Sequence, residues 1–206
     1  MSRRLPARLV LATGNAGKLR ELRAMLAPSG VEVLPLSDFT GSAAEETGST
    51  FVENAALKAR FAARAAGLPA IADDSGLEVD ALGGAPGIRS ARYAGEAAGD
   101  AANNAKLLLE LAAVPDARRG ARYRCAMVFV VGPNDPAPLV REASWEGRIA
   151  TAPRGAGGFG YDPLFIVAGT ERTAAEFEAG EKNRASHRGK ALRALVEALG
   201  GGTREP

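Results

Sequence analysis

Apolar residues recur along the chain with the periods of both strands and helices. A short apolar run at residues 9–12 predicts a buried strand, which leads into a T-G-N-A-G loop. Leucines within residues 18–30 then fall at helical spacing until Gly30 ends the pattern, and residues 31–36 alternate as a second strand. This order of strand, loop, helix and strand predicts an α/β protein.

The next segment predicts a helix and then a short strand that precedes an acidic turn. Residues 50–53 (T-F-V-E) have the capping-box pattern and start an alanine-rich helix that runs to about residue 66. Residues 70–72 form an apolar run, which we expect to end as a strand at the turn-forming sequence D-D-S-G of residues 73–76. An acidic pair therefore follows directly on a predicted strand.

The second half of the chain predicts a hairpin and two further helices. Asp100 is placed to cap a helix, residues 122–131 have the strongest strand pattern, and residues 139–150 supply its hairpin partner. A last helix is expected over residues 186–199. No repeat or linker divides the 206 residues. We therefore expect one domain over the whole chain, or two lobes that share a cleft, with a frayed tail after about residue 200.

Composition narrows the class of protein. The 26 basic and 24 acidic residues give a net charge of +2, which is too small a field for a protein that coats nucleic acid or an anionic membrane. The apolar runs are too short to span a bilayer, and we expect a cytoplasmic protein. The single Cys125 excludes an internal disulfide and is expected to be a buried apolar residue. Alanine and arginine dominate, so the five lysines and the one histidine stand out.

The loop at residues 13–18 (T-G-N-A-G-K) has the features of an anion site. A small loop that feeds a helix offers free N–H groups and the positive end of the helix dipole, and Lys18 adds a point charge. A P-loop is excluded, because Ala12 and Leu19 stand where that motif needs glycine and a hydroxyl residue. An ordinary turn with a surface lysine remains the alternative.

The adjacent residues Asp73 and Asp74 indicate a binding site for a divalent cation. Two adjacent carboxylates after an apolar strand are costly unless their charge is offset, and Mg²⁺ prefers a few carboxylates together with substrate phosphates. Glu45 or Glu46, from the preceding polar loop, could complete the set. The alternative is a solvated turn, which the sequence D-D-S-G also suits.

Two later segments could contact a flat ligand. The loop G-G-F-G-Y-D-P presents Phe159 and Tyr161, on which a nucleobase could stack, although both rings could instead pack into the core. His187 follows Ser186, an expected N-cap. A helix start disfavours its protonation, so a neutral ring that reads a carbonyl is predicted. The alternative for His187 is a solvated polar helix start.

Five segments together resemble one family. In order and at similar spacing, ATGNAGKLRE, EETGSTFVENAALKA, ADDSGLEVDALGGAPGIRSARYAG, GAGGFGYDPLF and EKNRASHRGKAL are similar to the RdgB-like inosine/xanthosine triphosphate pyrophosphatases. The resemblance covers residues 9–199. It implies Mg²⁺-dependent hydrolysis of dITP, ITP and XTP to the monophosphate and pyrophosphate. It also implies a homodimer whose α/β subunit has a twisted mixed β-sheet flanked by helices, with two lobes around a central nucleotide-binding cleft.

The resemblance also implies roles for particular residues. Asp74 would be the catalytic carboxylate, orienting a water that attacks the α-phosphorus. The implied metal ligands are Glu46, Asp74 and Asp73, with the choice of Glu46 over Glu45 open. The implied substrate-binding residues are Thr13, Gly14, Asn15, Ala16, Gly17, Lys18, Ser75, Phe159, Gly160, Tyr161, Asp162, Lys182, His187 and Arg188.

Selectivity would follow from the oxygen at purine C6, to which His187 or Arg188 could donate. Adenine has an amino group there and would repel a donor. Guanine shares the oxygen, and burying its 2-amino group unpaired costs about 1–3 kcal/mol, so discrimination against it should be finite.

Other classes of protein fit less well. A Maf-like nucleotide pyrophosphatase should lack the S-H-R and F-G-Y-D segments, both of which are present. A non-catalytic nucleotide-binding module has little need for an acidic trio that faces phosphates. A nucleic-acid-binding protein is disfavoured by the near-neutral charge.

Overall fold

The computed structural model describes residues 4–200, which form two compact units. Unit 1 is Met1–Asp74, Cys125–Ala143 and Arg188–Pro206, and unit 2 is Ser75–Arg124 and Ser144–His187. The expected fraying after residue 200 concerns residues outside the described part of the chain. The cleft that the resemblance implies stays a prediction.

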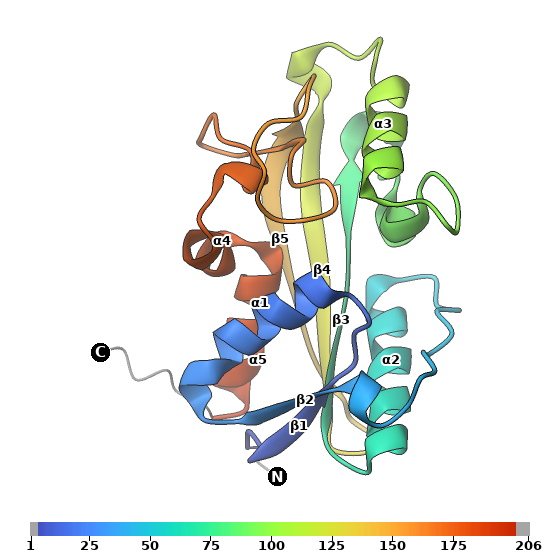
Figure 1. The fold of residues 1–206 in the computed structure, drawn as a ribbon, viewed down its shortest axis with the longest axis vertical. Coiled ribbons are helices and arrows are strands. Elements are labelled where there is room, and N and C mark those ends of the chain that lie inside the picture. The colour runs from blue at the N-terminus through green and yellow to red at the C-terminus, as the bar shows by residue number, and fades with distance from the viewer. Residues whose placement is uncertain (1–3, 201–206) are drawn as a thin grey trace. The chain divides into compact units, whose positions relative to one another are not determined.

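The described strands form one sheet of mixed direction (Figure 1). In chain order the strands are β1 (Arg8–Leu11), β2 (Glu32–Pro35), β3 (Ala70–Val79), β4 (Gly120–Val130), β5 (Leu139–Ile149) and β6 (Phe165–Val167). Their order in the sheet is β2-β1-β3-β4-β5-β6, with β1 parallel to both β2 and β3 and β5 antiparallel to β6. The predicted α/β class is therefore confirmed. By the division into units, β3, β4 and β5 each continue from one unit into the other.

The α-helices in the described part of the chain are α1 (Ala16–Leu26), α2 (Phe51–Ala66), α3 (Asp100–Glu110), α4 (Ala179–Ala185) and α5 (His187–Ala198). In unit 1, α1 and α5 pack on one face of the sheet, where leucines of both helices meet Leu9 and Met127. Helix α2 lies on the other face of the sheet (Figure 1). Its alanines pack against Val10 and Val128. In unit 2, Leu107 of α3 packs into a separate core.

Strand alternation explains why both faces are covered in unit 1. Along β4, Cys125 and Met127 belong to the core under α1 and α5, while Ala126 and Val128 belong to the core under α2. Successive side chains on a strand point to opposite faces, so a continuous apolar run needs cover on both sides. The same alternation along β3 sets the directions of the two aspartates.

The structure differs from the sequence-based expectation in three places. Strand β3 does not end at residue 72 but continues through D-D-S-G to Val79, because Leu77 and Val79 bury in the core of unit 2. Asp100 is the first residue of α3 rather than its cap, which is Gly99. Strand β6 and helix α4 were not predicted, since at three and seven residues they show no clear period.

Candidate functional site

The first loop is shaped by its own polar side chains. Asn15 is the N-cap of α1, and its side-chain oxygen accepts a hydrogen bond from the Lys18 N–H at 3.0 Å. The Thr13 hydroxyl accepts one from the Asn15 N–H at 3.1 Å. Gly14 and Ala16 are exposed and Gly17 is buried. The loop is therefore held in one conformation at the start of a helix, where backbone N–H groups and the helix dipole favour an anion.

Asp73 lies on the face of β3 that α1 and α5 cover, two residues beyond the core residue Ile71. Its side chain is fully buried, and its Oδ2 lies 2.9 Å from Lys18 Nζ and 3.2 Å from Arg188 Nε. Arg188 also donates through Nη1 to Glu21 of α1 at 2.5 Å. Burial alone would raise the pKa of the Asp73 carboxyl, but Lys18 and Arg188 hold that pKa well below its usual range. The buried carboxylate of Asp73 thus holds the Lys18 ammonium in an ion pair.

Asp74 points to the opposite face of the strand, the side of Ala72 and helix α2. Its Oδ1 accepts a hydrogen bond from Lys58 Nζ of α2 at 2.7 Å, and the same Nζ lies 3.2 Å from Glu46 Oε1. Burial raises the pKa of Asp74, partly offset by Lys58. Burial lowers the pKa of Lys58, but Asp74 and Asp73 outweigh it and raise that pKa.

The polar loop before α2 is anchored so that Glu46 reaches Lys58. The Gly48 N–H donates to Asn54 Oδ1 at 2.8 Å, and Glu53 Oε2 accepts from the N–H groups of Ser49 and Thr50 in the predicted capping box. A side chain at Gly48 would come within 2.6 Å of Glu53 Cβ. Between the two candidate glutamates, it is Glu46 that pairs with Lys58.

The residues that could hold a metal are Asp74 and Glu46. Within residues 4–200, no three His, Cys, Asp or Glu side chains gather as a ready-made metal site. Asp73 is separated from the other two carboxylates because adjacent residues on a strand face opposite ways. Asp74 Oδ2, however, is buried and has no hydrogen-bond partner among the described residues. Two carboxylates with one open oxygen fit a hard cation that completes its coordination with substrate oxygens.

In unit 2, Asp162 organises the predicted base-side loop. Its Oδ2 accepts from Lys182 Nζ at 2.6 Å and from the Phe159 N–H at 2.8 Å, and its Oδ1 accepts from the Tyr123 hydroxyl at 3.2 Å. Gly158 has φ +74°, and a Cβ there would collide with Asp162 Oδ2. The turn around this carboxylate therefore requires glycine.

The aromatic rings at and near this loop differ in how deeply they are buried. Tyr161 is 4% exposed, lies in the core of unit 2 and donates its hydroxyl to the Ser90 carbonyl, so its ring packs inside as the alternative interpretation expected. Phe159 is half-buried, with Lys182 Nζ 4.8 Å from its ring centroid. The buried His187 ring stacks on Tyr123 at 4.7 Å. Among these rings, Phe159 keeps the most exposed surface for a ligand.

Sequence reasoning did not assign roles to Lys58, Glu21 and Tyr123, the main partners of the predicted residues. One feature of the sequence could have indicated a role for Lys58. It stands three residues after Ala55 and one before Ala59, on the buried face of an alanine helix, where a lysine needs a carboxylate partner. Glu21 and Tyr123 left no such signal, since both fit ordinary helix and strand patterns. Ser75, the remaining predicted residue, is half-buried in β3.

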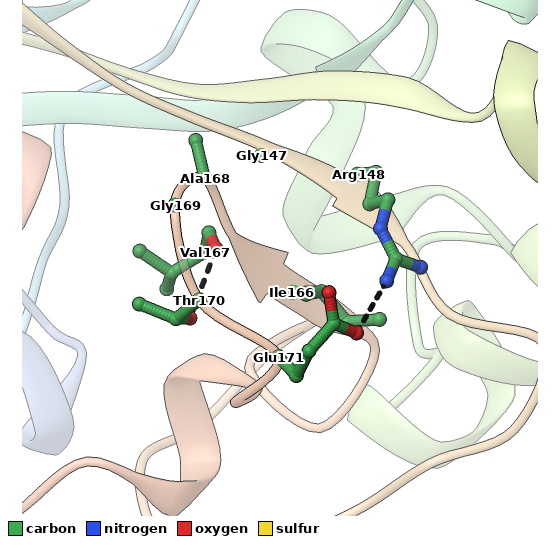
Figure 2. A pocket seen from close by; sticks show the side chains of 8 residues that line it. All are labelled: Gly147, Arg148, Ile166, Val167, Ala168, Gly169, Thr170 and Glu171. Carbon is green, nitrogen blue, oxygen red and sulfur yellow. Dashed lines mark hydrogen bonds and ion pairs between the residues drawn. The ribbon is translucent and has the colours of Figure 1, made fainter.

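A surface pocket of about 470 Å³ lies elsewhere in unit 2, between β5 and the loop after β6 (Figure 2). Figure 2 shows Arg148 paired with Glu171 at one side, at 2.8 Å. None of the predicted site residues lines this pocket, so it is separate from the candidate site.

The fold and these side chains define an α/β protein in which a loop suited to an anion starts a helix and buried carboxylates pair with lysines. The Ham1 family model matches residues 9–198, and this chain belongs to the Ham1 family. The predicted resemblance is thereby confirmed. No helix in residues 4–200 is long and apolar enough to cross a membrane.

Individual relatives agree with this assignment. The chain is 59% identical to a dITP/XTP pyrophosphatase of Thioalkalivibrio sulfidiphilus, over 94% of this chain and 99% of the relative. It is 54% identical to the dITP/XTP pyrophosphatase of Escherichia coli K12, over 95% of this chain and 99% of that relative. Among solved structures, a HAM1 protein from Coxiella burnetii superposes with a TM-score of 0.87 at 48% identity, covering 96% of this chain and all of that one.

Proposed function

We propose that this chain is a dITP/XTP pyrophosphatase, which removes deaminated purine nucleotides from the nucleotide pool before they reach DNA and RNA. The proposed reaction hydrolyses dITP, ITP or XTP to the monophosphate and pyrophosphate. The observation that supports it most directly is Asp74, a buried carboxylate with one open oxygen, beside Lys58 and Glu46. The names of the relatives supply the substrate class.

Unit 1 supplies the residues for the phosphate chain. Lys18 and the N–H groups of the loop from Thr13 to Gly17 bind the triphosphate, and Asp73 holds the Lys18 ammonium in place. Asp74 and Glu46 would hold Mg²⁺, which neutralises charge on the phosphates when it is bound. Asp73, engaged by two cations on the other face of β3, is assigned to positioning rather than to the metal.

Asp74 is also the proposed catalytic base. Burial raises its pKa, which makes this carboxylate a better proton acceptor than an exposed aspartate. It orients a water toward the α-phosphorus and takes its proton, the bond from that phosphorus to the bridging oxygen breaks, and pyrophosphate leaves. Positioning and charge stabilisation supply most of the rate.

Unit 2 supplies the residues for the base. Phe159 stacks on the purine, and His187 and Lys182 donate to the C6 oxygen, with Gly160, Asp162 and Ser75 shaping that subsite. Arg188 already donates to Asp73 and Glu21, so any contact that it makes with the base is made from that fixed position. Tyr161 supports the loop from the core.

The test is a substrate panel. The purified protein is incubated with Mg²⁺ and dITP, XTP, dGTP, dATP or dTTP, and pyrophosphate and orthophosphate are assayed separately. We expect pyrophosphate from dITP and XTP, much less from dGTP, and none after chelation with EDTA. Orthophosphate release, a preference for dTTP, or no turnover would each refute the proposal. A homodimer in the cytoplasm is part of the same proposal, and light scattering on the purified protein tests the dimer.

A further inference from the structure

We propose that Asp100 and Asn104 of helix α3 are positioning residues that hold the base-side loop at Gly160 and thereby set nucleobase selectivity. The inference rests on the proposed function. Neither residue belongs to the loop itself, since Asp100 and Asn104 lie 60 and 56 residues before Gly160 in the sequence.

Two hydrogen bonds fix the backbone on both sides of Gly160. The Gly160 N–H donates to Asp100 Oδ2 at 2.6 Å, and Asn104 Nδ2 donates to the Gly160 carbonyl at 2.9 Å. Asp100 and Asn104 are one helical turn apart, so they present their side chains on the same face of α3. Because each peptide group is planar, binding the N–H of one and the carbonyl of the next orients both peptide planes. We call this pair of hydrogen bonds the Gly160 clamp.

Packing does not hold this point of the loop. Gly160 has φ +64°, a conformation that other residues rarely adopt, and a Cβ there would meet no atom within 4 Å. On its C-terminal side Tyr161 is fixed in the core, but on its N-terminal side Phe159 is only half-buried. The peptide that joins Phe159 to Gly160 is also restrained from the C-terminal side, because Phe159 exchanges hydrogen bonds with Asp162 through its N–H at 2.8 Å and its carbonyl at 3.3 Å. The clamp is therefore the restraint on this peptide that comes from outside the loop, from helix α3.

Its loss should affect the base and not the chemistry. Phe159 is the proposed stacking ring, whereas the proposed catalytic residue Asp74 belongs to unit 1. A hydrogen bond to a carboxylate is about twice as strong as a neutral one, so Asp100 should contribute more than Asn104. Releasing the loop lets Phe159 move, which weakens binding of the correct base and relaxes rejection of the wrong one.

The variants are Asp100→Ala and Asn104→Leu, which remove the acceptor and the donor. Asp100→Asn is the conservative partner, since its amide oxygen can still accept the Gly160 N–H. Asn103→Ala is the matched control on the same helix, because Asn103 bonds to Ala91 and Ala94 and does not contact the loop in the described contacts. Thermal midpoints are measured for all four.

In Asn104→Leu we expect KM for dITP to rise about tenfold, the free-energy equivalent of one lost hydrogen bond, and in Asp100→Ala we expect a larger rise, with kcat within about twofold of the parent in both variants. The ratio of kcat/KM for dITP to that for dGTP should fall by a similar factor. Asp100→Asn should restore most of this ratio. Asn103→Ala should lower the thermal midpoint but leave the ratio of the two kcat/KM values unchanged. Equal losses on dITP and dGTP, or Asp100→Asn behaving like Asp100→Ala, would overturn the proposal.

Amide hydrogen exchange tests the clamp without any nucleotide. A peptide that covers residues 157–163 should lose protection in Asp100→Ala and Asn104→Leu and keep it in Asn103→Ala. Unchanged protection overturns the clamp even if the parent protein hydrolyses dITP. Lost protection in a protein that does not hydrolyse dITP upholds the clamp and refutes the proposed function instead.

Discussion

At the scale of single residues, the two adjacent aspartates have opposite electrostatic surroundings. Asp73 sits between Lys18 and Arg188, and these cations hold its pKa low despite complete burial. Asp74 has one lysine and an open oxygen, and burial raises its pKa. A carboxylate that is already neutralised suits a supporting role, whereas one that is partly neutralised can still take a proton or a cation. The difference in the surrounding cations favours Asp74 over Asp73 as the proposed catalytic carboxylate.

Asp74→Asn should therefore abolish most of the activity. The amide keeps the shape and can still accept from Lys58, but it cannot act as a base. We expect kcat with dITP to fall by about 10²–10⁴, the usual contribution of a positioned base. Steady-state kinetics on protein shown to be folded by circular dichroism is the measurement. Activity within a few-fold of the parent would remove Asp74 from the mechanism.

Asp73 should make stability depend on pH in the acid range. Its pKa is lower in the folded protein than in the unfolded chain, so the unfolded chain binds its proton at a higher pH and acidification favours unfolding. The stabilising contribution is complete above about pH 4 and is lost as pH falls through the folded-state pKa. We expect Asp73→Asn to be less stable at pH 7, by about 3–5 kcal/mol, because Lys18 and Arg188 lose a buried partner.

The measurement is the free energy of unfolding in urea, from pH 7 to pH 3, in buffer with EDTA. The parent should lose more stability than Asp73→Asn between pH 4 and pH 3, so the two curves converge. Parallel curves would show that the folded protein does not depress the pKa of Asp73.

At this scale the sequence singles out most of the candidate site residues, but it does not predict the side chains that pair with them. Asp73 and Asp74 stood out as two adjacent carboxylates after an apolar run, and Lys18 stood out as one of few lysines, in a loop that starts a helix. That Asp73 and Asp74 would meet different cations could not be seen, because it depends on β3 continuing through D-D-S-G. Which glutamate pairs with Lys58 depends on the path of an irregular loop, and no periodicity encodes that path.

At the scale of elements, the start of helix α2 anchors the loop that precedes it. The capping box starts the helix, and the same side chains, with Asn54, tie down the loop that contains Glu46. Lys58 lies two turns further along α2. The start of the helix thus sets where the Glu46 carboxylate lies relative to Lys58.

Gly48→Ala should disturb this arrangement. The new Cβ would come within 2.6 Å of Glu53 Cβ and 2.7 Å of Asn54 Oδ1, so the loop must shift. We expect a loss of stability of about 1–3 kcal/mol, and a higher Mg²⁺ concentration for half-maximal activity because Glu46 moves. Gly41→Ala, in the same loop with nothing within 4 Å of the new Cβ, is the control. An unchanged Mg²⁺ requirement in Gly48→Ala would count against Glu46 as a ligand.

Regular elements with clear sequence signals were predicted well. Helix α2 begins after Thr50, as its capping box indicated, and ends at Ala66, the expected end of the alanine-rich pattern. Strands β4 and β5, the expected hairpin, are neighbours in the sheet. The prediction failed for β3, since D-D-S-G favours a turn in isolation. Tertiary contacts overrode that preference, because the lysines and Arg188 neutralise the aspartates within the strand.

At the scale of the whole molecule, the two units are joined by more than loops. Strands β3, β4 and β5 belong in part to each unit, and the chain crosses from one to the other within a strand. Each unit has its own apolar core, yet neither is a continuous segment of the chain. We therefore expect a loss of backbone order in one unit to extend along these strands into the other.

We expect the units to unfold together, and the chain offers one probe in each. Cys125, in unit 1, is buried, and burial raises the pKa of its thiol to about 12, so it should react with thiol reagents only after unfolding. Trp145, the only tryptophan, is 4% exposed in the core of unit 2 and reports by fluorescence. Thiol labelling and fluorescence should give the same urea midpoint. Two midpoints would show that the units unfold independently.

The alternation along β3 also limits how this gene can vary in length. Deleting or inserting one residue between Ile71 and Asp73 would move each following side chain to the opposite face of the strand. The Asp74 carboxylate, which pairs with Lys58, would then lie on the face that α1 and α5 cover. Substitutions among the apolar residues of β3 alter packing only. A change of one codon in length at this point reverses the direction of both aspartates, so we expect the site to tolerate apolar substitutions in β3 better than a change in the length of the strand.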